Sequence, residues 1–182
     1  EGFWQENTDI NSVSIGIELD YSPNGKNNHF SLKMINSLKK LLIKLKKKYK
    51  ISKKNILAHS DIAPFRKKDP GKYFPWKSLS SAKIVATFET LNKNELKIIE
   101  QWFENYNFKS KKKIIILALS LIGYDTREIH NNPKNYNMLI NAYKSRYLNS
   151  GNILKNKSVY IHVIEHLFNF ILTKNNINLL GT

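Results

Sequence analysis

The residues most able to do chemistry stand together in one short segment, residues 59–71. It holds His59 and, ten residues later, Asp69, which precedes a Pro-Gly pair. A neutral imidazole and a carboxylate are ordinary zinc ligands, and a loop stiffened by proline holds such a pair at low entropic cost. The pattern therefore predicts a shared cation. The alternative places Asp69 as a turn cap and His59 at the edge of the core.

A second candidate is Glu18, which ends an alternating apolar run over residues 13–19. The alternation and the central Gly16 predict a β-strand that another backbone approaches closely. A carboxylate at the end of a buried strand is placed to act on water beside a metal. The alternative is a strand-end glutamate that faces solvent.

The elements that must position these residues fall into two halves. Residues 32–49 carry leucine and isoleucine at three- and four-residue spacing, which predicts an amphipathic helix with its lysines in solvent. Residues 56–58 are predicted as a short buried strand that ends at His59, and residues 60–76 as irregular. The pattern then becomes helical, with helices predicted over residues 93–106, 110–122, 133–148 and 157–174.

Composition limits the possible functions. The chain has 182 residues, no cysteine and a net charge of +16 from 30 basic and 14 acidic residues. The missing cysteines exclude disulfides, thiolate metal sites and cysteine nucleophiles. The positive charge is nearly all lysine and is spread along the chain, whereas nucleic-acid binders concentrate charge on one face and add arginine. We therefore expect no nucleic-acid partner, and an anionic wall polymer or a membrane surface fits the charge equally well.

Two motifs carry a family resemblance. Asn11 and the run SIGIEL at residues 14–19 resemble the N-x-x-S-I-G-I-E core of the zinc-dependent N-acetylmuramoyl-L-alanine amidases, the type 2 amidase family. Residues 58–76, AHSDIAPFRKKDPGKYFPW, are similar to the G-H-S-D-I-A-P-x-R-K-x-D-P-G-x-x-F-P-W signature of its AmiD-like branch. Ala58 stands where the family usually has glycine.

The resemblance implies a role for each matched residue. His59 and Asp69 become zinc ligands, and Glu18 becomes the general base and acid acting on zinc-bound water. Lys67 stabilises the oxyanion of the tetrahedral intermediate. The implied reaction is hydrolysis of the amide between N-acetylmuramic acid and L-alanine in peptidoglycan or muropeptides, with Zn²⁺ as cofactor.

The family's first zinc-ligating histidine lies on an upstream strand, and none of His29, His130, His162 and His166 matches it. We therefore expect a missing N-terminal segment that supplies the third ligand, so that this chain alone binds zinc weakly, releases no stem peptide and self-associates. The predicted fold is α/β, a mixed sheet flanked by helices, followed by a small all-helical domain. Residues 1–80 form the C-terminal part of the amidase domain, residues 81–92 a linker and residues 93–182 the helical domain.

The helical half carries two further motifs. Residues 140–147, INAYKSRY, are similar to the I-x-A-[FY]-Q-x-R-[FY] helix of three-helix peptidoglycan-binding domains, with Lys144 in place of glutamine. A plain helical bundle with the same aromatic core is the alternative. Residues 162–166 spell H-x-x-E-H, the inverted zinc-protease motif. That motif needs a downstream carboxylate, which the sequence lacks, so a core helix containing two histidines is favoured.

The predicted function is therefore N-acetylmuramoyl-L-alanine amidase activity, and the expected place is the bacterial cell envelope or periplasm, with the cytoplasm as the alternative. Two other functions stay open. One is a non-catalytic peptidoglycan-binding fragment that has lost its zinc site. The other is a basic nucleic-acid-binding protein, which a steep salt dependence of DNA affinity would reveal.

Overall fold

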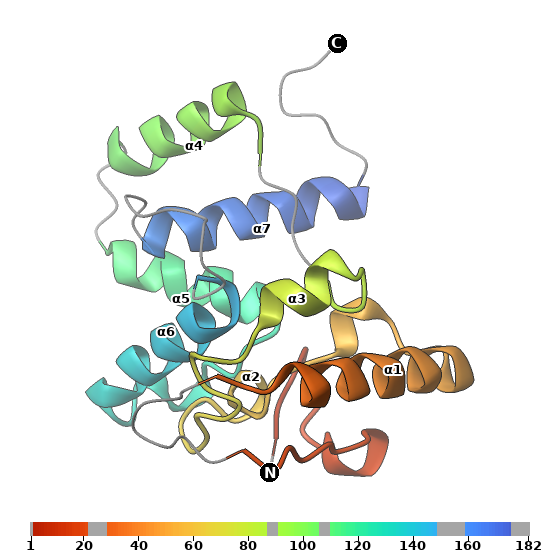
Figure 1. The fold of residues 1–182 in the computed structure, drawn as a ribbon. Helices are drawn as coiled ribbons and strands as arrows, with labels where there is room; N and C mark the ends of the chain where they lie inside the picture. The colour runs from red at the N-terminus through yellow and green to blue at the C-terminus, as the bar shows by residue number, and fades with distance from the viewer. Residues whose placement is uncertain (1, 22–28, 87–90, 106–109, 149–158, 176–182) are drawn as a thin grey trace.

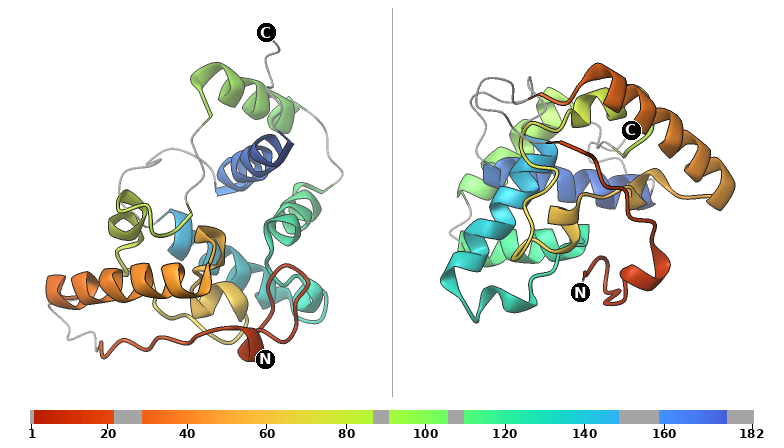
Figure 2. Two further views of the ribbon diagram at one scale, coloured as in Figure 1. Left: turned by 90° about the vertical axis from the view of Figure 1, so that its right-hand side faces the viewer. Right: turned by 60° about the horizontal axis from the view of Figure 1, so that its bottom comes forward.

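The computed structural model describes residues 2–21, 29–86, 91–105, 110–148 and 159–175, with side chains up to residue 171. In Figure 1, α4, α7 and α5 follow one another from the top downwards, α6 lies below them near α2, and α1 lies at the lower right. Figure 2 also shows α1 apart from α4 in its left-hand view. In chain order the elements are η1 (Asn11–Val13), α1 (Leu32–Tyr49), η2 (Lys53–Asn55), α2 (His59–Ile62), α3 (Trp76–Ser81), α4 (Lys93–Asn105), α5 (Lys111–Ile122), η3 (Arg127–Ile129), α6 (Pro133–Tyr147) and α7 (Val159–Asn175).

The predicted long helices are confirmed, and their ends follow from capping chemistry. Helix α1 covers the predicted range and begins where the Ser31 hydroxyl accepts a hydrogen bond from the Met34 amide. Helix α5 begins after Ser110 and ends at Gly123, which takes a positive φ. Helix α6 begins after Asn132, with proline at its first position. The first residues predicted for α7, 157 and 158, lie outside the described residues.

The predicted mixed α/β sheet is wrong for the part of the chain that the structure describes, where no β-strand occurs. The structure has only one isolated bridge there, between Trp4 and Asn7. Residues 14–20 follow η1 without regular structure, beginning with Ser14 in an extended conformation, and they make no backbone hydrogen bond to another described residue. Alternation predicts which side chains face a core, but a strand also needs a partner to complete its hydrogen bonds.

The predicted strand at residues 56–58 is wrong as well. Ala58 is extended, with φ −82° and ψ 157°, but it serves as the residue before helix α2. The first residue of that helix is His59, and the segment predicted as irregular, residues 60–76, contains the rest of α2 and the start of α3. The apolar run was too short to distinguish a strand from the entry to a helix.

Two hydrophobic clusters form the interior. The first lies among α4–α7 and includes Trp4 from the beginning of the chain, with Ile10, Leu57, Ile62 and Phe65 packed against it. The second packs α1 against residues 74–85, and its buried members are Phe30, Ile35, Leu38, Leu42, Ala58, Phe74, Trp76, Leu79, Ile84 and Val85. The helical half is thus joined to the first half by packed side chains. Of the predicted linker at residues 81–92, residues 87–90 lie outside the described residues.

One lysine of α1 departs from the predicted solvated face. The Lys46 ammonium donates a hydrogen bond of 2.9 Å to the Ile84 carbonyl and is partly buried, whereas Lys47 and Lys48 are exposed. No described helix is both long and apolar enough to span a membrane.

Candidate active site

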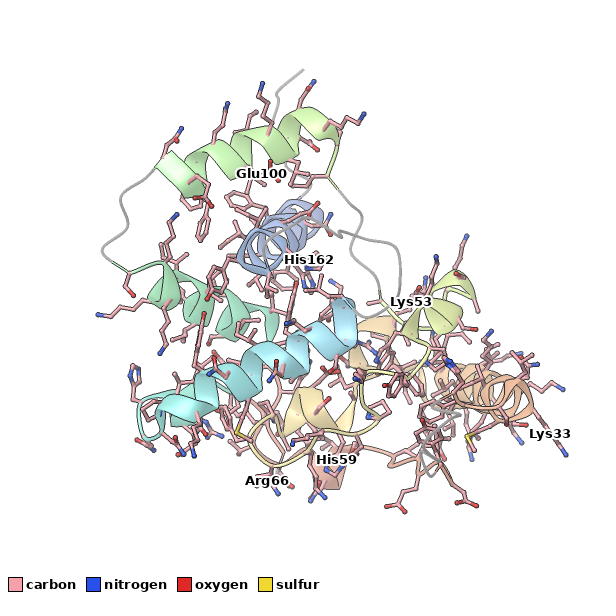
Figure 3. The ribbon with its side chains drawn as sticks, turned by 60° about the vertical axis from the view of Figure 1, so that its left-hand side comes forward. Lys33, Lys53, His59, Arg66, Glu100 and His162 are labelled. Atoms are coloured by element: carbon pink, nitrogen blue, oxygen red, sulfur yellow. The ribbon has the colours of Figure 1, made fainter. Side chains whose placement is uncertain are left out.

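The structure brings the two predicted zinc ligands together. His59 Nδ1 lies 2.9 Å from Asp69 Oδ2, and the Ser60 amide donates to the Asp69 carbonyl at 3.0 Å. The two residues are therefore joined through both their side chains and the backbone between them. Both side chains are open to solvent, with 44% of His59 and 60% of Asp69 exposed. Figure 3 shows His59 at the edge of the molecule, on the other side of α6 from His162.

A single buried carboxylate holds the backbone in front of His59. Asp61 Oδ2 accepts a hydrogen bond of 2.7 Å from the Ala58 amide, and its Oδ1 accepts one of 2.9 Å from the Tyr124 hydroxyl. Only 1% of Asp61 is exposed. Burial raises the pKa of this carboxyl, and the Arg146 charge and the two hydrogen bonds oppose that shift. Asp61 thus caps α2 and ties it to Tyr124, which follows α5.

Arg146 of helix α6 completes this buried junction. Its Nε lies 3.8 Å from Asp61 Oδ2, and its Nη2 donates a hydrogen bond of 2.9 Å to the Ile56 carbonyl. The guanidinium also lies 3.5 Å from the centroid of the Trp76 ring, a close cation–π contact. One arginine of the helical half therefore contacts both ends of the 56–76 segment. We call Asp61, Trp76, Tyr124 and Arg146 the junction.

The other two predicted site residues lie on the surface. Glu18 is exposed within the unpaired residues 14–20. Lys67 is exposed on the loop between His59 and Asp69, where its amide donates to the Ala63 carbonyl at 2.9 Å. Lys67 thus shares a loop with the His59–Asp69 pair, whereas no described contact joins Glu18 to it. The roles predicted for both residues remain predictions.

The His59–Asp69 pair suits zinc by donor type and by separation. Ligand atoms about 2.1 Å from a tetrahedral zinc ion lie about 3.4 Å apart. The observed 2.9 Å is close to that value, so a small opening of the pair would let both atoms reach one ion. A catalytic zinc site uses three protein ligands. Within the described ranges, no third histidine, aspartate or glutamate joins the pair to form such a group.

The H-x-x-E-H residues serve the helical core. His162 and Glu165 are buried, and His162 Nδ1 lies 2.9 Å from the Tyr143 hydroxyl. The same hydroxyl lies 3.2 Å from His166 Nδ1. Burial, followed by the charges of His162 and Arg146, lowers the pKa of His166 to about 3, so its imidazole is neutral at neutral pH. This is the core helix that the sequence favoured.

The sequence analysis missed the junction residues as functional candidates. Asp61 and Trp76 lie inside the matched signature, but no role was assigned to them. Arg146 lies in the INAYKSRY motif, on the face that also carries the buried Ala142 and Tyr143. A charged residue on an otherwise apolar helix face was the available signal, because such a charge needs a buried partner.

Comparison with known proteins agrees with the sequence motifs. Residues 3–72 match the family described as N-acetylmuramoyl-L-alanine amidase. The chain is 38% identical over 95 residues to N-acetylmuramoyl-L-alanine amidase AmiD of Escherichia coli, covering 46% of this chain and 32% of that protein. It is 45% identical over 76 residues to 1,6-anhydro-N-acetylmuramyl-L-alanine amidase AmpD of Haemophilus influenzae, covering 40% of this chain and 39% of that protein. The matched region thus spans about a third of one relative and about two fifths of the other.

Solved structures extend the likeness into the helical half. The E. coli AmiD complex with the substrate anhydro-N-acetylmuramic acid-L-Ala-D-gamma-Glu-L-Lys matches with a TM-score of 0.71 and 24% identity, covering 97% of this chain and 68% of that one. AmpDH3 of Pseudomonas aeruginosa matches with a TM-score of 0.71 and 25% identity, covering 94% of this chain and 67% of that one. The predicted resemblance is confirmed: residues 3–72 match the N-acetylmuramoyl-L-alanine amidase family, and the matched region is similar to AmiD.

Proposed function

We propose that this protein hydrolyses the amide bond between N-acetylmuramic acid and L-alanine in peptidoglycan or its muropeptide fragments. The observation that carries the proposal is the His59–Asp69 pair, 2.9 Å apart and open to solvent, inside the amidase-matching residues. Two solved structures that this chain resembles hold muropeptide ligands: the E. coli AmiD complex and AmpDH3 of Pseudomonas aeruginosa in complex with anhydromuramic pentapeptide. Both support a peptidoglycan fragment as the substrate class. A wall substrate also supports placing the protein in the bacterial cell envelope.

In the proposed reaction His59 and Asp69 hold a zinc ion through the imidazole nitrogen and a carboxylate oxygen. Zinc, when bound, supplies a Lewis acid and lowers the pKa of bound water to about 7. The Glu18 carboxylate takes a proton from the attacking water and returns it to the leaving amine of L-alanine. The Lys67 ammonium, on the same loop as the pair, offsets the negative charge that develops on the carbonyl oxygen.

The experiment is a muropeptide assay, with and without added Zn²⁺, on a form of the protein that contains a third zinc-ligating histidine. The released peptide is quantified by mass spectrometry. His59→Ala should remove both zinc binding and peptide release. Glu18→Gln should keep zinc and lower the rate by about two to four orders of magnitude, because it removes a general base and not a ligand. His130→Ala is the matched control, since it removes an exposed histidine of the helical half.

Two results would contradict the proposal. Peptide release that survives His59→Ala would show that the pair is not the reaction centre. A form with the third histidine that binds purified peptidoglycan but releases no peptide with zinc present would favour the non-catalytic wall-binding function.

A further inference from the structure

The backbone that presents His59 is fixed from the helical half of the chain. Ala58 directly precedes His59, and its amide is held by the carboxylate of Asp61. That carboxylate is in turn held by the Tyr124 hydroxyl, from the turn after α5. Two successive hydrogen bonds thus lead from the turn after α5 to the residue before His59.

A second connection reaches the same segment from α6. Arg146 binds the Ile56 carbonyl, three residues before His59, and stacks on Trp76, beyond Asp69. One rigid guanidinium contacts the chain on both sides of the His59–Asp69 loop. A shift of α6 would therefore move both ends of this loop together. Asp61 and Arg146 are almost fully buried, so the contacts lie in a region of low dielectric where they are strong and costly to break.

These observations concern the helical half, for which the sequence suggested only wall binding or a plain bundle. We infer that the helical half positions the metal-binding pair. Tyr124 and Arg146 act through Asp61 to fix the backbone at the start of α2 and so the orientation of the His59 side chain. This inference rests on the proposed function. Tyr124 and Arg146 are positioning residues, because their contacts are to Asp61, Ile56 and Trp76 and not to the reacting groups.

The geometry explains why positioning is needed here. His59 and Asp69 are both largely exposed, so packing around their own side chains constrains them little. Their 2.9 Å separation depends on the backbone at residues 58–60 and on the amide of Ser60 bound to the Asp69 carbonyl. Residues that orient metal ligands from behind affect metal affinity by about 10- to 100-fold in known sites.

The test measures zinc affinity of the full 182-residue chain by calorimetry, at a temperature where circular dichroism shows each variant to be folded. Tyr124→Phe removes one hydroxyl and keeps the ring. It should weaken zinc binding by about tenfold, the low end of the range for orienting partners. Arg146→Lys, which cannot contact Asp61, Ile56 and Trp76 at once, should weaken it by at least as much. Tyr136→Phe is the matched control. This α6 tyrosine belongs to the same hydrophobic cluster as Tyr124, but its ring faces Lys112 and not the junction.

A second measurement does not depend on metal or on turnover. In the metal-free chain, the NMR resonances of the His59 imidazole report its contact with Asp69. They should shift in Tyr124→Phe and Arg146→Lys and stay unchanged in Tyr136→Phe. If wild-type chain binds no zinc, the proposed metal site fails, but this measurement still tests the positioning.

The inference is overturned if Tyr124→Phe and Arg146→Lys lower the melting temperature yet leave zinc affinity and the His59 resonances as in wild type. The junction would then stabilise the fold without acting on the pair. If Tyr124→Phe does not fold, the outcome for Arg146→Lys decides.

Discussion

Two segments matched by the amidase family behave differently in this structure. Residues 56–76 are held by a buried carboxylate, an arginine from α6 and a tyrosine after α5. Residues 14–20 are unpaired within the described chain, with Ile15 49% exposed and only Ile17 and Leu19 packed against the α1 cluster. The comparison teaches that a segment fixed by side chains from distant helices keeps its geometry without a sheet, whereas a strand-like segment does not.

The largest expected effect comes from breaking the junction. Asp61→Ala removes the acceptor for the Ala58 amide and the Tyr124 hydroxyl and leaves Arg146 buried without its carboxylate. Loss of one member of a buried ion pair costs about 3–5 kcal/mol. Urea denaturation should therefore show the free energy of unfolding reduced by this amount. Asp69→Ala, in the same loop but exposed, should change stability little; equal effects would show that the junction does not hold the segment.

A smaller effect is expected at Gly123, where the start of the chain meets α5. Gly123 has φ +132°, and an added Cβ would lie 2.9 Å from atoms of Trp4 and Gln5. Gly123→Ala should cost about 2–3 kcal/mol, because overpacking adds to an unfavourable backbone conformation. Thermal unfolding followed by circular dichroism measures it. A neutral substitution would mean that Trp4 does not pack on this turn in solution.

Acid should lower the stability of the helical half of the chain, which supplies Tyr124 and Arg146 to the junction. The pKa of His166 is lowered from its ordinary value of 6.5 to about 3, and the groups facing it are Tyr143, Tyr147, His162 and Arg146. Between these two values the unfolded chain binds a proton that the folded chain does not, so stability rises with pH. It should fall by about 1 kcal/mol for each pH unit lowered in that window.

Urea midpoints at a series of pH values between 6.5 and 4 measure this slope. His166→Gln should flatten it, because it removes the titrating group. The hydrogen-exchange protection factors of residues 58–62 should fall in acid together with those of α6, while residues 14–20 should show little protection throughout. An unchanged slope in His166→Gln would assign the acid sensitivity to another group.

The smallest effect is expected at Gly16. An added Cβ there meets no atom within 4 Å, in contrast to Gly123. Gly16→Ala should leave the free energy of unfolding within about 0.5 kcal/mol of wild type. A clear loss of stability in the same thermal assay would reveal a neighbouring backbone, as the sequence pattern first suggested for this glycine.

The sequence predicted the helices well because their signals are local. Ser31, Ser110 and Asn132 begin helices by accepting backbone hydrogen bonds within three residues, and Gly123 ends one. The sheet was predicted wrongly, because the alternation within a segment does not say whether another segment is there to pair with it. Lys46 shows the same limit, since its bond to Ile84 joins residues that are far apart in the chain.

The site was predictable as far as the motif extends. The family signature contains both His59 and Asp69, and the structure places His59 Nδ1 2.9 Å from Asp69 Oδ2. Their role as zinc ligands stays a prediction. The partners of Asp61 were not predictable, because Tyr124 and Arg146 lie 63 and 85 residues further along the chain. Contacts at such separation depend on how helices pack, which a local pattern does not specify.

The position of Trp4 in the helical cluster has a consequence for dividing this chain into two fragments. Its ring packs edge-on against Tyr124 at 5.2 Å, so residues from the beginning of the chain complete a core built mainly from its second half. Polypeptides comprising residues 1–86 and 91–182, each expressed with this surface uncovered, should therefore reassemble as complementing fragments. We therefore expect the predicted linker at residues 81–92 to be a point at which the protein can be split into two fragments that complement each other.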